Sequence, residues 1–310
     1  MSGPVSEAEA GTTEPVVTAS AGSPIEVFPS RTARVGAGSV RRALPLRRHR
    51  TVGAWCFLDH FGPEVVNAET AMMVGPHPHI GLQTVTWLLE GEAVHTDSLG
   101  TEQPIRPGQL NLMTAGRGVA HAEDGRDRDA RTMHGVQLWL AQPENMRFGA
   151  PAFEHHDELP KLERPSARGH VLVGELSGVR SPARTDTPVV GADLAVEGTA
   201  ELPVDVRFEH ALVVLDGHVA VDGQQVQRDE LAYVAPGRDS ITLTSARTTR
   251  LLLLGGTPFE ETILMWWNFV ARTRDEVNDA YRDWQDRSDR FGAVATSLPP
   301  MPVPGPSWLD

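Results

Sequence analysis

Cysteine is almost absent from this chain, because Cys56 is the single one among 310 residues. An intramolecular disulfide is therefore impossible, and a small fold stabilised by disulfides is excluded. Cys56 lies within an apolar run at 54–58, where we expect a buried, unreactive thiol. This usage fits the reducing cytoplasm, which we predict as the location of the protein.

Long apolar runs are also lacking. No stretch approaches the roughly 18 apolar residues that cross a bilayer, so we expect no membrane contact. The segment 1–24 contains three glutamates but no basic residue and no apolar core, so we do not expect it to be a signal peptide. Because it has almost nothing to bury, we predict a disordered tail over these residues.

Positive charge is scarce: 28 Lys and Arg face 41 Asp and Glu, a net charge of −13. An acidic surface repels nucleic acid phosphates and anionic lipids, so direct nucleic acid binding is not expected. The segment 31–50 nevertheless carries seven arginines. We interpret it as a solvated strand face or as partners for the excess carboxylates, and a recognition patch is the alternative.

Glycine (29) and proline (24) are plentiful, which favours many short strands joined by tight turns. One apolar run, 86–89, ends at Glu90-Gly91, and a similar run, 212–215, ends at Asp216-Gly217. The segments 109–116 and 230–237 follow them in the same order and also resemble each other. We therefore predict an all-β protein of two barrels that arose by duplication.

The chain length suits two domains of ordinary size. The segment 141–165 is rich in proline and charge, and we interpret it as a long connection. Residues 263–270 predict one apolar strand. Thr273 with Glu276 forms a capping-box spacing that predicts a short helix.

The predicted units are a tail at 1–24, an N-terminal barrel at 25–145, a linker at 146–168, a C-terminal barrel with the helix at 169–290, and a Pro-rich tail at 291–310.

Two histidine motifs indicate a metal site in the first barrel. Residues i and i+2 of a strand project from one face about 7 Å apart, so His77 and His79 can converge on one ion. His121 and Glu123 repeat this spacing 42 residues later. Together they would supply three nitrogens and one carboxylate, with positions left open for catalysis. The alternative is four solvent-facing or hydrogen-bonded side chains without a metal.

The sequence resembles the pirin family, a branch of the bicupin superfamily, from about residue 25 to 290. The resemblance is carried by several ordered motifs. They are Asp59-His60-Phe61-Gly62-Pro63, the segment 77–86 that begins His77-Pro78-His79, Asp97-Ser98-Leu99-Gly100, the segment 113–123 that ends His121-Ala122-Glu123, 135–140, Leu254-Gly255-Gly256 and Trp266-Trp267-Asn268-Phe269-Val270.

This resemblance implies two cupin barrels, of which only the first binds a metal, usually iron. The family's ligands fall on His77, His79, His121 and Glu123, the same four that the spacing indicates. Some pirins resemble quercetin 2,3-dioxygenases in activity, and others are regulators that bind transcription factors or metabolic enzymes. One departure is Gln83, at a position where pirins often keep a glutamate.

Two functions follow as hypotheses. The first is an Fe(II)-dependent dioxygenase that acts with O2 on quercetin-type flavonols or related small aromatics, with Glu123 as the general base. The alternative is a non-enzymatic, iron-dependent regulator that binds a protein partner. A stable barrel with a vestigial metal site is a third, less specific interpretation.

The other histidines receive structural interpretations. We predict that His155 and His156 lie on a surface loop, and that His60 supports a turn. His95 and His134 could line the first barrel beside the ligands, although for His95 an ordinary hydrogen bond is favoured. In the second barrel, His210 and His218 lack a suitably spaced carboxylate, so we predict that this barrel is metal-free.

Overall fold

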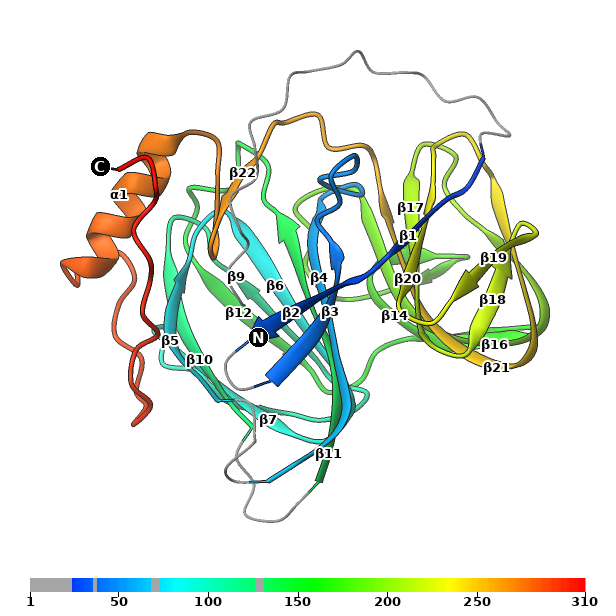
Figure 1. Cartoon of the computed structure of the whole chain (residues 1–310), viewed down its shortest axis with the longest axis horizontal. Coiled ribbons are helices and arrows are strands. Elements are labelled where there is room, and N and C mark those ends of the chain that lie inside the picture. Colours follow the sequence, from blue (N-terminus) through cyan, green and yellow to red (C-terminus); the bar gives the residue numbers. More distant parts are fainter. Residues whose placement is uncertain (1–23, 36–37, 68–72, 126–130, 310) are drawn as a thin grey trace.

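The computed structural model describes residues 24–35, 38–67, 73–125 and 131–309, so nearly all of the predicted N-terminal tail lies outside the described residues. The described chain is mostly β-strand, with one short helix near its C-terminal end. Two barrels lie side by side, and the helix packs on the outside of the first (Figure 1). The predicted all-β class with two cupin barrels is confirmed.

The first barrel combines a seven-stranded and a four-stranded antiparallel sheet. The large sheet has the order β12-β9-β6-β11-β4-β3-β2. Its strands are β2 Arg31–Val35, β3 Gly38–Leu44, β4 Trp55–Val66, β6 Leu82–Glu90, β9 Leu110–Thr114, β11 Arg131–Ala141 and β12 Ala152–His156. The small sheet has the order β5-β10-β7-β8, with β5 Met73–His79, β7 Ala93–Asp97, β8 Glu102–Ile105 and β10 Val119–Asp124.

The second barrel is one ten-stranded sheet, with β1-β20-β17-β21-β16-β14-β13 as its main path. Its strands are β1 Glu26–Pro29, β13 Lys161–Arg164, β14 Ala167–Leu176, β15 Val179–Arg180, β16 Val189–Pro203, β17 Glu209–Asp216, β18 His218–Val221, β19 Gln224–Gln227, β20 Glu230–Val234 and β21 Ser240–Gly256. The repeated segments fall on β6 and β9 in one barrel and on β17 and β20 in the other, at corresponding places in the strand order. The turn glycines Gly91 and Gly217 both have positive φ, 93° and 84°. This correspondence supports a duplication.

The strand pairing differs from the predicted units at their boundaries. β1 falls in the predicted first domain, yet it pairs with β20 of the second barrel. The predicted linker contains β12, which pairs with β9 of the first barrel, and β13, which pairs with β14 of the second. His155 and His156 lie on β12, so their prediction as loop residues was wrong. Backbone pairing across the sheet, which local composition does not reveal, decides these positions.

The interface between the barrels is a continuous apolar core to which both large sheets contribute, including Val85 and Leu138 from the first and Val213 and Leu252 from the second. Trp55, fully buried, donates its Nε1 hydrogen to the carbonyl oxygens of Val190 (3.0 Å) and Gly255 (3.3 Å) across this interface. Trp87 Nε1 likewise donates to Asp193 Oδ2 at 3.0 Å. The tryptophans therefore supply both apolar area and directional bonds between the barrels.

Several arginines of the 31–50 segment form ion pairs with carboxylates. This agrees with their interpretation as partners for the excess carboxylates. Arg42 binds buried Asp59 through two nitrogens, at 2.7 and 2.8 Å. Arg41 binds Asp229 of the second barrel at 2.8 Å, and exposed Arg48 lies 3.5 Å from Glu26.

Cys56 is buried as predicted, and burial raises the pKa of its thiol to about 12.

The segment after the second barrel returns to the first. The predicted single strand is a hairpin, β22 Leu264–Trp266 and β23 Phe269–Ala271, because Trp267 turns the chain with a φ of 50°. The helix, α1 Arg274–Gln285, begins as predicted: the side chain of Thr273 accepts a hydrogen bond from the backbone N–H of Glu276. No helix of the described residues is long and apolar enough to cross a membrane.

Val277 and Ala280 of α1 are buried against Ile80 and Ala120 of the first barrel, and the partly buried Tyr281 and Trp284 pack against the same cluster. The segment 291–309 continues along the same barrel. There the backbone N–H of Met301 donates to Pro76 O at 3.0 Å. The C-terminal segment therefore covers strand β5 of the first barrel.

Replacement of Trp55 by Phe tests the interface. We expect Trp55→Phe to lower the free energy of unfolding by about 3 kcal/mol, because it removes buried volume and the interdomain hydrogen bonds. The matched control is Trp308→Phe, which removes a single hydrogen bond to Asn278 at the partly exposed C-terminal end and should cost about 1 kcal/mol or less. Denaturant unfolding measures both, and equal losses would contradict this role of Trp55.

Candidate metal centre

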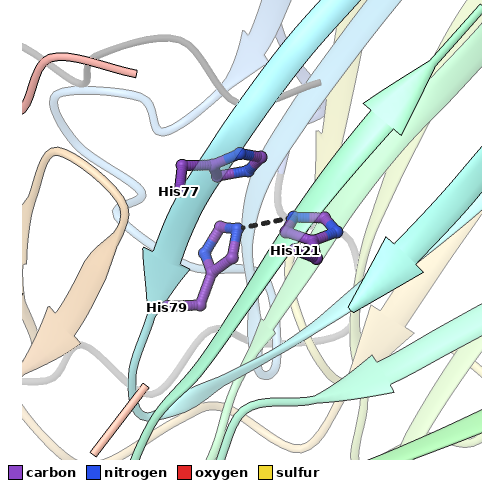
Figure 2. Close-up of side chains that lie close together, drawn as sticks. All are labelled: His77, His79 and His121. Atoms are coloured by element: carbon purple, nitrogen blue, oxygen red, sulfur yellow. Dashed lines mark hydrogen bonds between the residues drawn. The ribbon is translucent and has the colours of Figure 1, made fainter. Parts of the chain in front are cut away.

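Strands β5 and β10 place three histidines at one point inside the first barrel. The two strands are antiparallel neighbours, with His77 directly opposite His121 and His79 opposite Val119. The candidate ligand atoms of His77, His79 and His121 all lie within 4.8 Å of one another. Figure 2 shows the three rings pointing toward one another from the two strands. The residues are buried, with exposures of 0, 0 and 1%.

Hydrogen bonds fix the tautomer of the two histidines on β5. His77 Nδ1 lies 2.9 Å from Gly75 O, and His79 Nδ1 lies 3.1 Å from Asn268 O in the β22–β23 turn. A carbonyl oxygen can only accept, so each Nδ1 carries the proton and donates it. Each Nε2 is therefore left with a lone pair, which is the form that binds a metal.

His121 is oriented by a chain of two further side chains. Asp97 accepts hydrogen bonds at Oδ1 from the backbone N–H groups of Leu99 and Thr101, at 2.9 and 3.0 Å. Burial alone would raise the pKa of Asp97, but hydrogen bonds from His95 and these N–H groups lower it below its ordinary value. The Asp97 carboxylate thus accepts from His95 Nε2 at 3.1 Å.

The tautomer of His95 then decides that of His121. Because His95 donates through Nε2, its Nδ1 is an acceptor, and His121 Nδ1 donates to it at 3.2 Å. His121 Nε2 is left with a lone pair, as in the other two histidines. His95 therefore touches a ligand directly, beyond the ordinary hydrogen bond favoured for it from the sequence.

The three nitrogens fit a metal ion. His79 Nε2 and His121 Nε2 lie 3.0 Å apart, so two lone pairs face each other and repel unless a cation lies between them. Two nitrogens that bind one ion at about 2.1 Å and at a right angle are separated by about 3 Å. Burial lowers the pKa of His77 to about 4 and holds the pKa of His79 and His121 well below 6.5. Neutral imidazoles of this kind suit a transition metal.

Glu123 lies two residues beyond His121 on β10, and only 7% of it is exposed. It pairs with His95 on β7 and with Val74 on β5, after an irregularity in the register with β5. Its carboxylate is not part of the cluster whose atoms lie within 4.8 Å. Glu123 as the fourth ligand stays a prediction. Gln83, by contrast, donates its side-chain amide to Thr114 Oγ1 at 3.0 Å.

The remaining histidines that the sequence analysis singled out lie away from the cluster. His134 does not approach the cluster but lies against His60, with 2.8 Å between their Nε2 atoms. His210 is buried with both ring nitrogens unpartnered among the described residues. Within the described part of the second barrel, no group of three metal-binding side chains converges. The metal-free second barrel therefore stays a prediction.

Sequence reasoning missed two contributors to the site. Asp97 appeared only within a family motif, although its place two residues after His95 on one strand was a usable signal. Asn268 lies 189 residues from His79, and no sequence signal connects them. Its own side-chain amide is fully buried without a partner among the described residues, so a polar group beside the cluster is left unsatisfied.

Comparison with known proteins agrees with the two-barrel fold. Residues 37–140 match the pirin family and residues 189–292 match the pirin C-terminal cupin domain. A Pseudomonas aeruginosa protein with the provisional name of quercetin 2,3-dioxygenase is 45% identical, over 88% of this chain and 89% of its own length. A pirin-like protein of Caulobacter vibrioides is 37% identical, over 84% of this chain and 92% of its own.

A solved structure gives the same result. The crystal structure of quercetin 2,3-dioxygenase from Acinetobacter baumannii superimposes with a TM-score of 0.87 and 43% sequence identity. The match covers 91% of this chain and 95% of that one. Sequence and structure thus agree over both barrels and the helix: the chain belongs to the pirin family.

Proposed function

We propose that this protein is an Fe(II)-dependent dioxygenase that cleaves quercetin-type flavonols or related aromatics with O2. The observation that carries the proposal is the convergence of three buried, neutral histidines whose candidate ligand atoms all lie within 4.8 Å of one another. Relatives that bear the name quercetin 2,3-dioxygenase match the chain over nearly its whole length, which supports this substrate class.

The histidines His77, His79 and His121 would hold the iron, with Glu123 as the fourth ligand. A bound Fe(II) would polarise a hydroxyl group of the substrate and provide a place for O2 beside it. Glu123 is proposed to take the proton of that hydroxyl at a carboxylate oxygen, because it lies on the same strand as His121 and is buried near His77. Asp97 and His95 act by keeping His121 in its metal-binding tautomer.

Glu123→Gln tests the proton transfer. The amide cannot accept the substrate proton, so we expect iron-loaded Glu123→Gln to consume O2 with quercetin at least about 100-fold more slowly than the wild type. Metal content is measured on the same sample. The control Glu102→Gln, at the exposed first position of β8, should retain full activity. Full turnover by metal-containing Glu123→Gln would contradict the assigned role.

Asp97→Asn tests the orienting chain. The oxygen of the new side-chain amide would keep the two backbone N–H groups, so its NH2 would face the N–H of His95 and turn that ring out of register. We expect the affinity for iron to fall by about 10- to 100-fold, measured by competition with a chelator. Asp216→Asn, at the end of β17, is the control, and an unchanged affinity in Asp97→Asn would show that the chain is dispensable.

The buried histidines also predict a pH dependence for the metal-free protein. Burial lowers the pKa of His77 from 6.5 to about 4 in the folded state, so as the pH falls the unfolded chain takes up the proton first. Stability is therefore full above pH 6.5 and is lost progressively toward pH 4, by roughly 3 kcal/mol from His77 alone. Denaturant unfolding of chelator-treated protein at several pH values measures this loss.

His77→Gln removes the titrating group and should flatten this pH dependence, whereas His155→Gln on β12 should leave it unchanged. A dependence of equal steepness in His77→Gln would mean that other groups cause the acid sensitivity.

A further inference from the structure

A cleft of about 720 Å³ lies between the two barrels, outside the histidine cluster. The first barrel contributes Glu90 and His134 to its lining, and the second contributes Asp193 and Arg250. A volume of this size accommodates a small organic ligand. None of the residues assigned to the metal centre lines it.

A hydrogen-bonded chain of three side chains leads into this cleft. Asp229, between β19 and β20, lies 3.0 Å from His60 Nδ1 through its Oδ1 atom. His60 Nε2 lies 2.8 Å from His134 Nε2. His60 is buried, at 1% exposure, and His134 lines the cleft with 7% exposure. The chain therefore runs from the second barrel, through β4, to a histidine of β11 at the cleft wall.

The charge of Asp229 decides the protons along this chain. Burial alone would raise the pKa of Asp229, but the hydrogen bond with His60 and the charge of Arg41 lower it. Asp229 is then a carboxylate, and its Oδ1 is nearer to His60 Nδ1, at 3.0 Å, than are the Arg41 nitrogens, which lie 3.3 Å from the same Nδ1 atom. His60 Nδ1 is therefore assigned as the donor to Asp229. His60 Nε2 is left as an acceptor, so the hydrogen between the two imidazoles belongs to His134 Nε2.

His134 Nδ1 consequently presents a lone pair. This nitrogen has no hydrogen-bond partner among the described residues. It is also not among the unpaired polar atoms that are completely buried. Burial, with the charges of Arg250 and Arg41 nearby, lowers the pKa of His134 to about 4, so the ring stays neutral. The cleft wall thus offers a fixed hydrogen-bond acceptor that needs a donor from outside the protein.

Arg250 supplies a hydrogen-bond donor to the lining of the same cleft. Arg250 binds Asp193 through Nε and Nη2, at 3.0 and 2.6 Å, and its Nη1 hydrogens are not used in this pair. Its side chain is 39% exposed, so these hydrogens can reach a ligand. His134 and Arg250 both line the cleft, so an acceptor and a donor are available to one ligand there.

The overall charge of the lining indicates a neutral ligand. Four basic side chains (Lys161, Arg168, Arg228 and Arg250) are balanced by four carboxylates (Glu90, Glu163, Asp193 and Asp216). A strongly charged ligand would be attracted by one set and repelled by the other. A hydroxyl group both donates and accepts, so a hydroxylated neutral molecule can pair with both sets.

We propose that this cleft is a binding site for a neutral small molecule with at least two hydroxyl groups, one donating to His134 Nδ1 and another accepting from Arg250. Both sugars and catechols carry two or more hydroxyls. The site is separate from the metal centre, and it stands whether or not the protein is a dioxygenase.

The test uses the full-length, chelator-treated protein, so that no metal binds the probes. Catechol and D-glucose are titrated by calorimetry and by ligand-observed NMR, with 1,2-dimethoxybenzene as a probe of similar shape that has no donor. We expect saturable 1:1 binding of catechol or of glucose, and none of 1,2-dimethoxybenzene. The probe that binds identifies the source of the hydroxyls as phenolic or sugar-like.

Variants locate the binding. His134→Leu should weaken it at least 10-fold, whereas His121→Ala in the metal centre and His155→Gln on β12 should leave it unchanged. Because His134→Leu could disturb its packing against His60, Ala195→Phe provides a second test: it fills the cleft from β16, where Ala195 is partly exposed. It should also abolish binding.

The proposal is overturned if neither probe binds, if 1,2-dimethoxybenzene binds as well as catechol, or if binding survives in both His134→Leu and Ala195→Phe. Oxygen uptake by the iron-loaded protein with quercetin is measured separately. Failure of the cleft proposal is therefore distinguishable from failure of the dioxygenase proposal.

Discussion

The Nδ1 protons of the three clustered histidines are all bound outside the cluster, and the rest of the site depends on this constraint. Gly75 O, Asn268 O and His95 Nδ1 are the acceptors. An imidazole has one proton when neutral, so a donor bond at Nδ1 leaves a lone pair at Nε2. The candidate ligand atoms of the three histidines lie within 4.8 Å of one another in a buried space where protonation is unfavourable. A cation would relieve the repulsion between the Nε2 lone pairs of His79 and His121, which lie 3.0 Å apart.

The acceptors come from three different parts of the chain, which explains why the site needs the whole architecture. Gly75 belongs to the same strand as His77, and His95 belongs to the neighbouring β7. Asn268 lies in the hairpin that follows the second barrel and returns to the first (Figure 1). The C-terminal hairpin, helix and tail therefore do more than cover apolar surface, because one of their carbonyls orients a ligand.

The two barrels have corresponding strand orders and meet at one interface. Their large sheets contribute to one apolar core, and Trp55 and Trp87 add hydrogen bonds across it. The same arrangement brings Asp229 of one barrel against His60 of the other. Polar groups that would be costly if buried alone are thus satisfied across the interface. The interface stabilises the pair of barrels and also forms the wall of the cleft.

The sequence by itself determined the barrel class, the internal repeat, the capped helix and the three histidines, because period-2 spacing and capping residues act over a few positions. Only the tertiary structure decided that β1 joins the second barrel, that residues 263–270 form a hairpin, and that His134 faces His60 instead of the metal cluster. It also supplied Asn268 as a partner of His79. These features depend on contacts between residues far apart in the chain, and local patterns carry no information about which distant backbone group will accept a given proton.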